Sequence, residues 1–105
     1  MSNQVLSLAI LEPVVGKEDA CLALLRDFYT LLHAKGYSSD LLYRDPKEPG
    51  RFVHLRMWYS EEARSEAQQD PEVHRFWIQL PDVCTITTIH ETLEQLFCTY
   101  TPEPA

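Results

Sequence analysis

This sequence is short of glycine, cysteine and basic residues, and each shortage excludes a class of protein. Only three of its 105 residues are glycine, and no glycine-rich phosphate loop is present, so a nucleotide or flavin site has no support. Its three cysteines lie far apart, a spacing that suits neither a disulfide framework nor a zinc motif. We therefore expect three reduced thiols.

Basic residues are outnumbered by acidic ones. The chain has 9 Lys and Arg against 16 Asp and Glu, which gives a net charge of −7. Nucleic acids and anionic membranes attract basic patches, so neither is an expected partner. No apolar run is long enough to cross a bilayer. The first residues carry no Lys or Arg ahead of their apolar part, which is unlike a signal peptide. We expect a cytoplasmic protein.

The length and the hydrophobic content of 45% suit one globular domain with a modest core. We expect this domain to span residues 1–98. Residues 99–105 contain two prolines and are expected to form a loose C-terminal tail.

Hydrophobic periodicity predicts four strands separated by helices and turns. The strands are predicted over residues 4–12, 37–44, 51–59 and 83–89.

The helices are predicted from an apolar period of three to four residues and from their end signals. The first runs from about residue 17 to a C-terminal cap at Gly36. The second follows Ser60 as N-cap, runs to about residue 69, and restarts after a capping Asp70. Pro81 is expected to stop it. Residues 92–98 could form a further short helix.

The order strand, helix, strand, strand, helix, strand predicts an α+β, ferredoxin-like βαββαβ fold. Its sheet is antiparallel and both helices lie on one face. The other face lacks a cover. We expect that face to carry Val5, Leu11, Phe52 and Trp58, an apolar patch that a second copy could cover by packing sheet to sheet. The prediction is a homodimer through the sheet face.

The strand at residues 51–59 carries the main candidate site. Phe52, His54, Arg56 and Trp58 share one of its faces, which thus combines two aromatic rings, an imidazole and a guanidinium. Arg56 could hold an anion or a phenolate, and Trp58 could stack on a ring. The alternative is that this face makes the dimer contact, because Arg and Trp are enriched in interfaces.

Three stretches resemble a known family: PVVGKEDACLALL, MWYSEEA and DPEVHRFW. They are similar to the antibiotic biosynthesis monooxygenase-like dimeric α/β barrel proteins, over about residues 5–89. The resemblance implies a homodimer with a cleft between sheet and helices. Some members oxygenate phenolic or quinol substrates without a metal or organic cofactor, and others degrade haem.

The resemblance also bears on single residues. Ala67 and Trp77 stand where haem-degrading members have a Trp and a His, so haem degradation is not expected. His74 sits where many members of the oxygenase branch have a histidine. A histidine can act as base toward an acidic phenol near neutral pH. The alternative is a surface histidine without a role.

The expected function is therefore cofactor-independent monooxygenation of a small aromatic phenol or quinol. The four histidines lack a short ligand pair, so no metal site is expected. The alternative is a non-catalytic dimeric barrel that binds a small ligand or serves only as an assembly module. The catalytic candidates are His74, His54 and Arg56, and the substrate-binding candidates are Phe52, Trp58, Tyr43 and Trp77.

Overall fold

The computed structural model describes residues 5–97 and 99 and has the predicted α+β, ferredoxin-like class. The predicted tail lies outside the described residues, apart from residue 99. None of the described helices is both long and apolar enough to cross a membrane. In chain order, the elements are β1 (Val5–Pro13), α1 (Glu18–Ala34), β2 (Ser38–Arg44), β3 (Phe52–Trp58), α2 (Glu61–Gln68), α3 (Pro71–Val83) and β4 (Cys84–Leu93).

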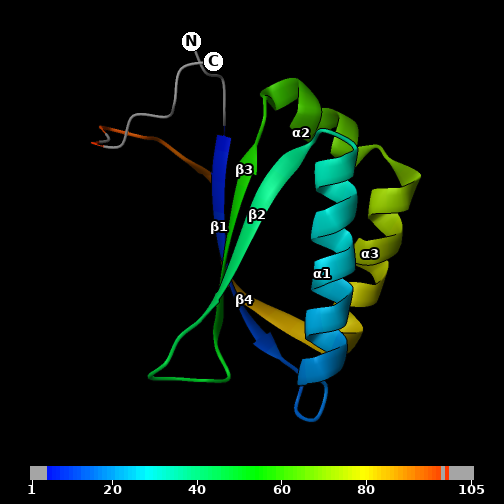
Figure 1. Cartoon of the computed structure of the whole chain (residues 1–105), viewed down its shortest axis with the longest axis vertical. Helices are drawn as coiled ribbons and strands as arrows, with labels where there is room; N and C mark the ends of the chain where they lie inside the picture. Colours follow the sequence, from blue (N-terminus) through cyan, green and yellow to red (C-terminus); the bar gives the residue numbers. More distant parts are fainter. Residues whose placement is uncertain (1–4, 98, 100–105) are drawn as a thin grey trace.

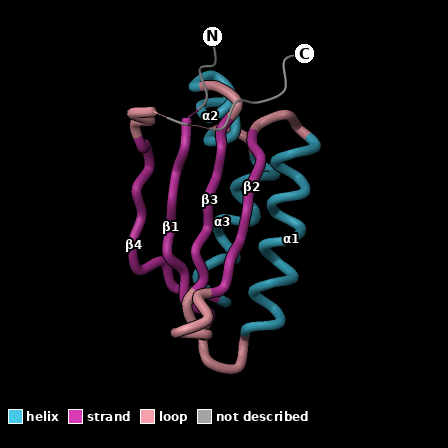
Figure 2. The backbone as a smooth tube through the Cα atoms, turned by 60° about the vertical axis from the view of Figure 1, so that its left-hand side comes forward, coloured by secondary structure: helices cyan, strands magenta, loops and turns pink. Residues whose placement is uncertain are grey.

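The four strands form one antiparallel sheet in the order β2-β3-β1-β4. The helices form a second layer on one face of this sheet, with α1 and α3 side by side and α2 at one end (Figure 1). Figure 2 shows the four strands in front of the helices. The other face of the sheet has no cover from the described part of the chain.

Local sequence sets most of the helix ends as predicted. The Ser60 hydroxyl accepts a hydrogen bond from the Ala63 amide at 3.0 Å, and Asp70 accepts one from the Glu72 amide at 2.9 Å. Gly36 follows α1 with a φ of 75°, which suits glycine. The predicted stop at Pro81 is wrong, because α3 continues to Val83. Pro81 has no N–H to donate and so removes one helical hydrogen bond, but it lies in the last turn of α3 and the helix ends soon after it, at Val83.

The C-terminal strand is longer than predicted. β4 begins at Cys84 and pairs with β1 as far as Leu93, so the helix predicted over residues 92–98 is wrong. Residues 94–97 have no regular structure, and residue 98 lies outside the described residues. The apolar spacing in this stretch resembled a helix, but the backbone of β1 is available to pair with it, and that ladder decides its conformation.

The sheet face that we expected to be uncovered is the one beneath the helices. Phe52 is 1% exposed and Trp58 is 4% exposed, and Val5 and Leu11 are also buried. Trp58 packs in one core cluster with Phe28 and Leu32 of α1, and Phe52 in another with Cys21 and Leu25 of the same helix. Alternation along a strand assigns residues to two faces, but it does not say which face the helices cover.

The uncovered face instead carries the other set of alternating residues on each strand, and most of these are apolar. On β2, the side chains of Leu41 and Tyr43 are more than half exposed. The apolar residues that β1, β2 and β3 place on this uncovered face are Leu6, Leu8 and Ile10 from β1, Val53, Leu55 and Met57 from β3, and Leu41 and Tyr43 from β2.

The assignment of the two faces can be tested by truncating a buried ring. Phe52→Ala should lower the free energy of unfolding by about 3–5 kcal/mol, because it leaves a cavity in the core. Ile78, which is 75% exposed on α3, provides the control, and Ile78→Ala should stay within about 0.5 kcal/mol of wild type. Chemical denaturation measures both values, and equal small losses would place Phe52 outside the core.

Candidate functional site

A cavity of about 270 Å³ lies between the sheet and the helices. It is bounded by residues of all three helices and of β1, β3 and β4. Its walls are mostly apolar, and the polar groups collect on the sheet side and along the β4 edge. The sheet contributes Ser7, Ala9, His54, Arg56 and Trp58, the helices contribute Leu25, Phe28, Tyr29, Trp77 and Leu80, and the edge includes Arg64, Gln68 and Glu91.

Strand register explains why there is space at this point. Ser7 of β1 is the partner of Arg56 on β3, and Ala9 is the partner of His54. Partners on antiparallel strands point to the same face. Two small side chains therefore stand beside two large polar ones, and the volume that larger residues would fill stays open.

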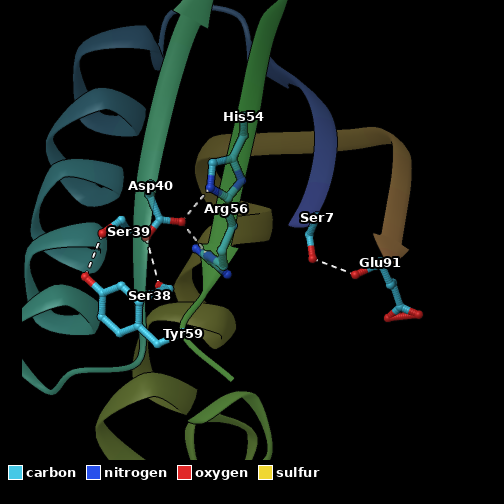
Figure 3. Close-up of polar contacts among 8 residues, drawn as sticks. All are labelled: Ser7, Ser38, Ser39, Asp40, His54, Arg56, Tyr59 and Glu91. Atoms are coloured by element: carbon cyan, nitrogen blue, oxygen red, sulfur yellow. Dashed lines mark hydrogen bonds and ion pairs between the residues drawn. The ribbon is translucent and has the colours of Figure 1, made fainter. Parts of the chain in front are cut away.

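The polar wall of the cavity is anchored by Asp40 of β2, whose side chain is 0% exposed. Its Oδ1 accepts hydrogen bonds from Arg56 Nε at 2.5 Å and from His54 Nε2 at 2.8 Å (Figure 3). Its Oδ2 accepts one from the Ser38 hydroxyl at 3.0 Å. Asp40 is the register partner of Arg56, so the strand pairing itself brings the opposite charges together.

The electrostatics of this group favour an ionised carboxylate beside a neutral imidazole. Burial raises the pKa of Asp40, but the hydrogen bonds from His54 and Arg56 and the charge of Arg56 outweigh it and hold the pKa below its usual range. Burial lowers the pKa of His54, and the charge of Arg56 lowers it further. The hydrogen bond to Asp40 opposes this shift without cancelling it.

Aromatic rings surround the cation of this network. The guanidinium carbon of Arg56 lies 5.1 Å from the ring centroid of Phe28, 5.2 Å from that of Trp58 and 5.7 Å from that of Tyr29. These are cation–π distances. The ring of Tyr29 also stacks on the imidazole of His54, with 4.7 Å between centroids.

Tyr29 lines the cavity and carries a buried hydroxyl group. This hydroxyl has no hydrogen-bond partner among the described residues. Burial raises the pKa of Tyr29, so its phenol stays protonated and is a hydrogen-bond donor. An unpaired buried donor costs free energy, and a ligand oxygen within hydrogen-bonding reach of it would relieve that cost.

The edge of the cavity is held by contacts among β1, α2 and β4. The Ser7 hydroxyl donates to the Glu91 carbonyl oxygen at 2.6 Å (Figure 3). Arg64 of α2 donates to the Thr92 hydroxyl at 3.2 Å and has the carboxylate of Glu91 at 3.9 Å. These contacts join α2 to the last strand beside the cavity.

The structure brings four of the predicted site residues together and separates three from them. His54, Arg56, Trp58 and Trp77 all line the cavity. Phe52 is buried in the core outside the cavity lining, and Tyr43 lies on the uncovered face of the sheet.

His74 is the third separated residue. It is exposed on α3, its ring stacks on Trp77 with 5.3 Å between centroids, and its Nε2 is hydrogen-bonded to the Gln68 carbonyl oxygen. It does not line the cavity.

Sequence reasoning missed Asp40 and Tyr29. Aspartate is depleted in strands, so a lone Asp in the middle of a predicted strand was an available signal. Tyr29 looked like one more member of the apolar stripe of its helix. As to metals, residues 5–97 and 99 contain no group of three or more His, Cys, Asp or Glu side chains placed to hold an ion.

Comparison with known proteins places this geometry in a family. The family model described as antibiotic biosynthesis monooxygenase matches residues 7–77. SnoaB, a cofactor-independent oxygenase from Streptomyces nogalater, has a similar structure, with a TM-score of 0.72 at 15% identity over 97% of this chain and 100% of that chain. Rv0793 from Mycobacterium tuberculosis gives 0.70 at 21% identity over 90% and 99% of the two chains. A search of curated proteins finds no match.

The buried ion pair can be tested by removing its cation. Arg56→Met should lower the free energy of unfolding by about 3–5 kcal/mol at neutral pH, because Asp40 keeps a buried charge without its guanidinium partner. Arg44→Met, which breaks the exposed Arg44–Glu18 pair at 2.8 Å, should change stability little. Denaturant unfolding of both variants makes the comparison, and equal losses would contradict a special role for the buried pair.

The same variant has a predicted pH dependence. The pKa of Asp40 is lowered in the folded protein, so its contribution to stability is present above the unfolded value and is lost as the pH falls below it. The difference in the free energy of unfolding between wild type and Arg56→Met should therefore become smaller below about pH 4, where the carboxyl group of Asp40 becomes protonated. Repeating the unfolding series at acidic pH measures this change.

Proposed function

This chain belongs to the antibiotic biosynthesis monooxygenase family, and from that premise we propose that it is a cofactor-independent monooxygenase acting on a small aromatic phenol or quinol. The observation that carries the proposal is the cavity, in which the side chains of His54 and Arg56 lie beside aromatic walls. Its volume of about 270 Å³ is near the lower end for ligand sites, so the ligand is small.

In the proposed complex, apolar residues hold the ring of the substrate. Trp58 from the sheet and Trp77 from α3 both border the cavity and offer flat surfaces for an aromatic ligand. The hydroxyl oxygen of the substrate points toward the polar wall. There it receives hydrogen bonds from the guanidinium nitrogens of Arg56 that Asp40 does not occupy.

The proposed chemistry begins with a proton transfer. His54 is neutral at ordinary pH because its pKa is lowered, so it can accept the proton of the substrate hydroxyl. The nearby charge of Arg56 stabilises the phenolate that forms. A phenolate is electron-rich enough to react directly with O₂.

The overall reaction balances without a further reductant. A hydroquinone and O₂ give a hydroxyquinone and water. One oxygen atom enters the ring, and the other leaves as water with electrons that the substrate supplies as it becomes a quinone. The protein thus has to bind, orient and deprotonate the substrate.

Variants of His54 and His74 test which of the two histidines is the catalytic base. With a panel of hydroquinones and an oxygen electrode, His54→Gln should lower kcat/KM by about 100-fold or more, because it removes the base in the cavity. His74→Ala is the matched comparison, and turnover should be nearly unchanged because that ring is exposed outside the cavity.

If His74→Ala lost turnover and His54→Gln did not, the base would be His74 on α3, as the family resemblance suggested. Absence of oxygen uptake by wild type across the whole panel would contradict the monooxygenase proposal. If intrinsic tryptophan fluorescence still changed with the same compounds, the non-catalytic, ligand-binding alternative would be supported, because two tryptophans border the cavity.

We also propose that two copies pack through the uncovered sheet face. This face is apolar over three strands, and Leu41 is 54% exposed on it in the single chain. Soluble proteins rarely leave such a patch in water. A second copy related by a two-fold axis would cover it with an identical surface.

A charge placed on this face should separate the copies. Leu41→Glu should give a monomer in size-exclusion chromatography with light scattering, because a carboxylate cannot be buried there without a partner. Ile78→Glu places the same charge on an exposed residue of α3 and should leave the dimer intact. A dimeric Leu41→Glu protein would place the contact elsewhere.

A cytoplasmic location is part of the proposal. Cys21 and Cys84 are both buried, belong to the same core cluster and carry free thiols. Neighbouring thiols without a disulfide suit a reducing compartment.

A further inference from the structure

We propose that Asp40 is a positioning residue that fixes the tautomer of His54, so that Nδ1 is the atom that accepts the proton of the substrate. The inference rests on the function proposed above, in which His54 is the base. Asp40 thereby determines which nitrogen of His54 accepts the proton.

An ionised carboxylate can accept hydrogen bonds but cannot donate them. Asp40 Oδ1 lies 2.8 Å from His54 Nε2, so the proton of this hydrogen bond is on Nε2. A neutral imidazole carries one proton. Nδ1 therefore holds a lone pair, and it makes no hydrogen bond to any of the described residues. Because His54 lines the cavity, this lone pair is the acceptor available to a ligand.

The surroundings of Asp40 keep it in the accepting state. Arg56 Nε donates to the same oxygen at 2.5 Å, and the Ser38 hydroxyl donates to the other at 3.0 Å. Both donors have fixed roles, because a guanidinium cannot accept and Oδ2 has no proton to give. The carboxylate is buried, and its hydrogen bonds from His54 and Arg56 favour the ionised form.

The groups that face His54 are few. Asp40 approaches from β2, Arg56 lies on the same strand, β3, and the ring of Tyr29 covers the imidazole from α1. On β1 the register partner is Ala9, which is neutral. Among them only the carboxylate favours the protonated imidazole, whereas burial and the Arg56 charge disfavour it.

The pairing gives Asp40 a second effect during proton transfer. When Nδ1 takes a proton, the imidazole becomes a cation, and the adjacent carboxylate stabilises it. The base should therefore be active above the pKa of His54 and inactive below it. That pKa is lower than the ordinary histidine value, so activity should persist into mildly acidic solution.

The tautomer can be read without any substrate. In protein labelled with ¹⁵N-histidine, ring ¹⁵N shifts and their couplings to ring hydrogens distinguish a protonated nitrogen from a bare one. His54→Gln identifies the signal of His54 by its loss. We expect protonated Nε2 and bare Nδ1 in wild type at neutral pH. A protonated Nδ1 would overturn the proposal, whatever the enzyme turns over.

The second arm measures the effect of the charge on turnover. Asp40→Asn keeps an oxygen that can accept from His54 and Arg56 but removes the negative charge. We expect kcat to fall by about tenfold or more, and the acidic limb of the pH–rate profile to move to lower pH. The shift follows because the group that favours the protonated imidazole is gone. An unmoved limb would overturn the positioning role, since a merely structural loss would lower activity at every pH.

Ser38→Ala is the matched control. It removes the hydrogen bond to Oδ2 and leaves the contact between Oδ1 and His54 in place. It should leave both the tautomer and the acidic limb unchanged, and a change equal to that of Asp40→Asn would overturn the assignment.

The tautomer measurement and the turnover measurement test the role of Asp40 and the proposed monooxygenase function separately. If Asp40→Asn does not fold, the wild-type tautomer still decides the inference. If wild type shows the expected tautomer but oxidises no hydroquinone, the function proposed above is contradicted, and the proton-accepting role of Nδ1 is overturned with it.

Discussion

The ion pair between Asp40 and Arg56 is the constraint on which the site depends. A carboxylate and a guanidinium lie under the helices of a small domain, where neither could remain without the other. Their contact requires the register in which β2 pairs with β3, because that register makes them partners. A shift of one residue would send one of them to the uncovered face. The ion pair therefore forms only when β2 and β3 pair in this register, and the polar wall of the cavity forms with it.

The same pair gives the cavity its chemical character. Because Asp40 takes up part of the hydrogen-bonding capacity of Arg56, the guanidinium is held in place with its remaining nitrogens free for a ligand. Because Asp40 also holds His54, an imidazole is fixed at the same wall. Small side chains on β1 leave the space beside them empty. Binding, orientation and proton transfer can therefore share one small volume, as a reaction without a cofactor requires.

Local signals predicted local features well and failed where distant contacts decided. Ser60 and Asp70 cap their helices as their types indicate, since a cap depends on the next few residues only. The helix predicted over residues 92–98 failed because a distant segment decides there: β1 offers its edge as far as Leu93. The predicted stop at Pro81 missed by the last residues of α3, which continues to Val83. His74 had a family precedent, yet the structure places it on the surface of α3.

By itself the sequence determined the order of the elements, the family and the grouping of His54, Arg56 and Trp58 on one strand face, because these follow from periodicity and motif. Only the tertiary structure decided that this face lies beneath the helices and that Asp40 and Tyr29 complete it. Alternation along a strand is symmetric between its two faces. The choice between them depends on whether α1 and β2 can supply partners for a buried charge, and those partners come from segments far away in the chain.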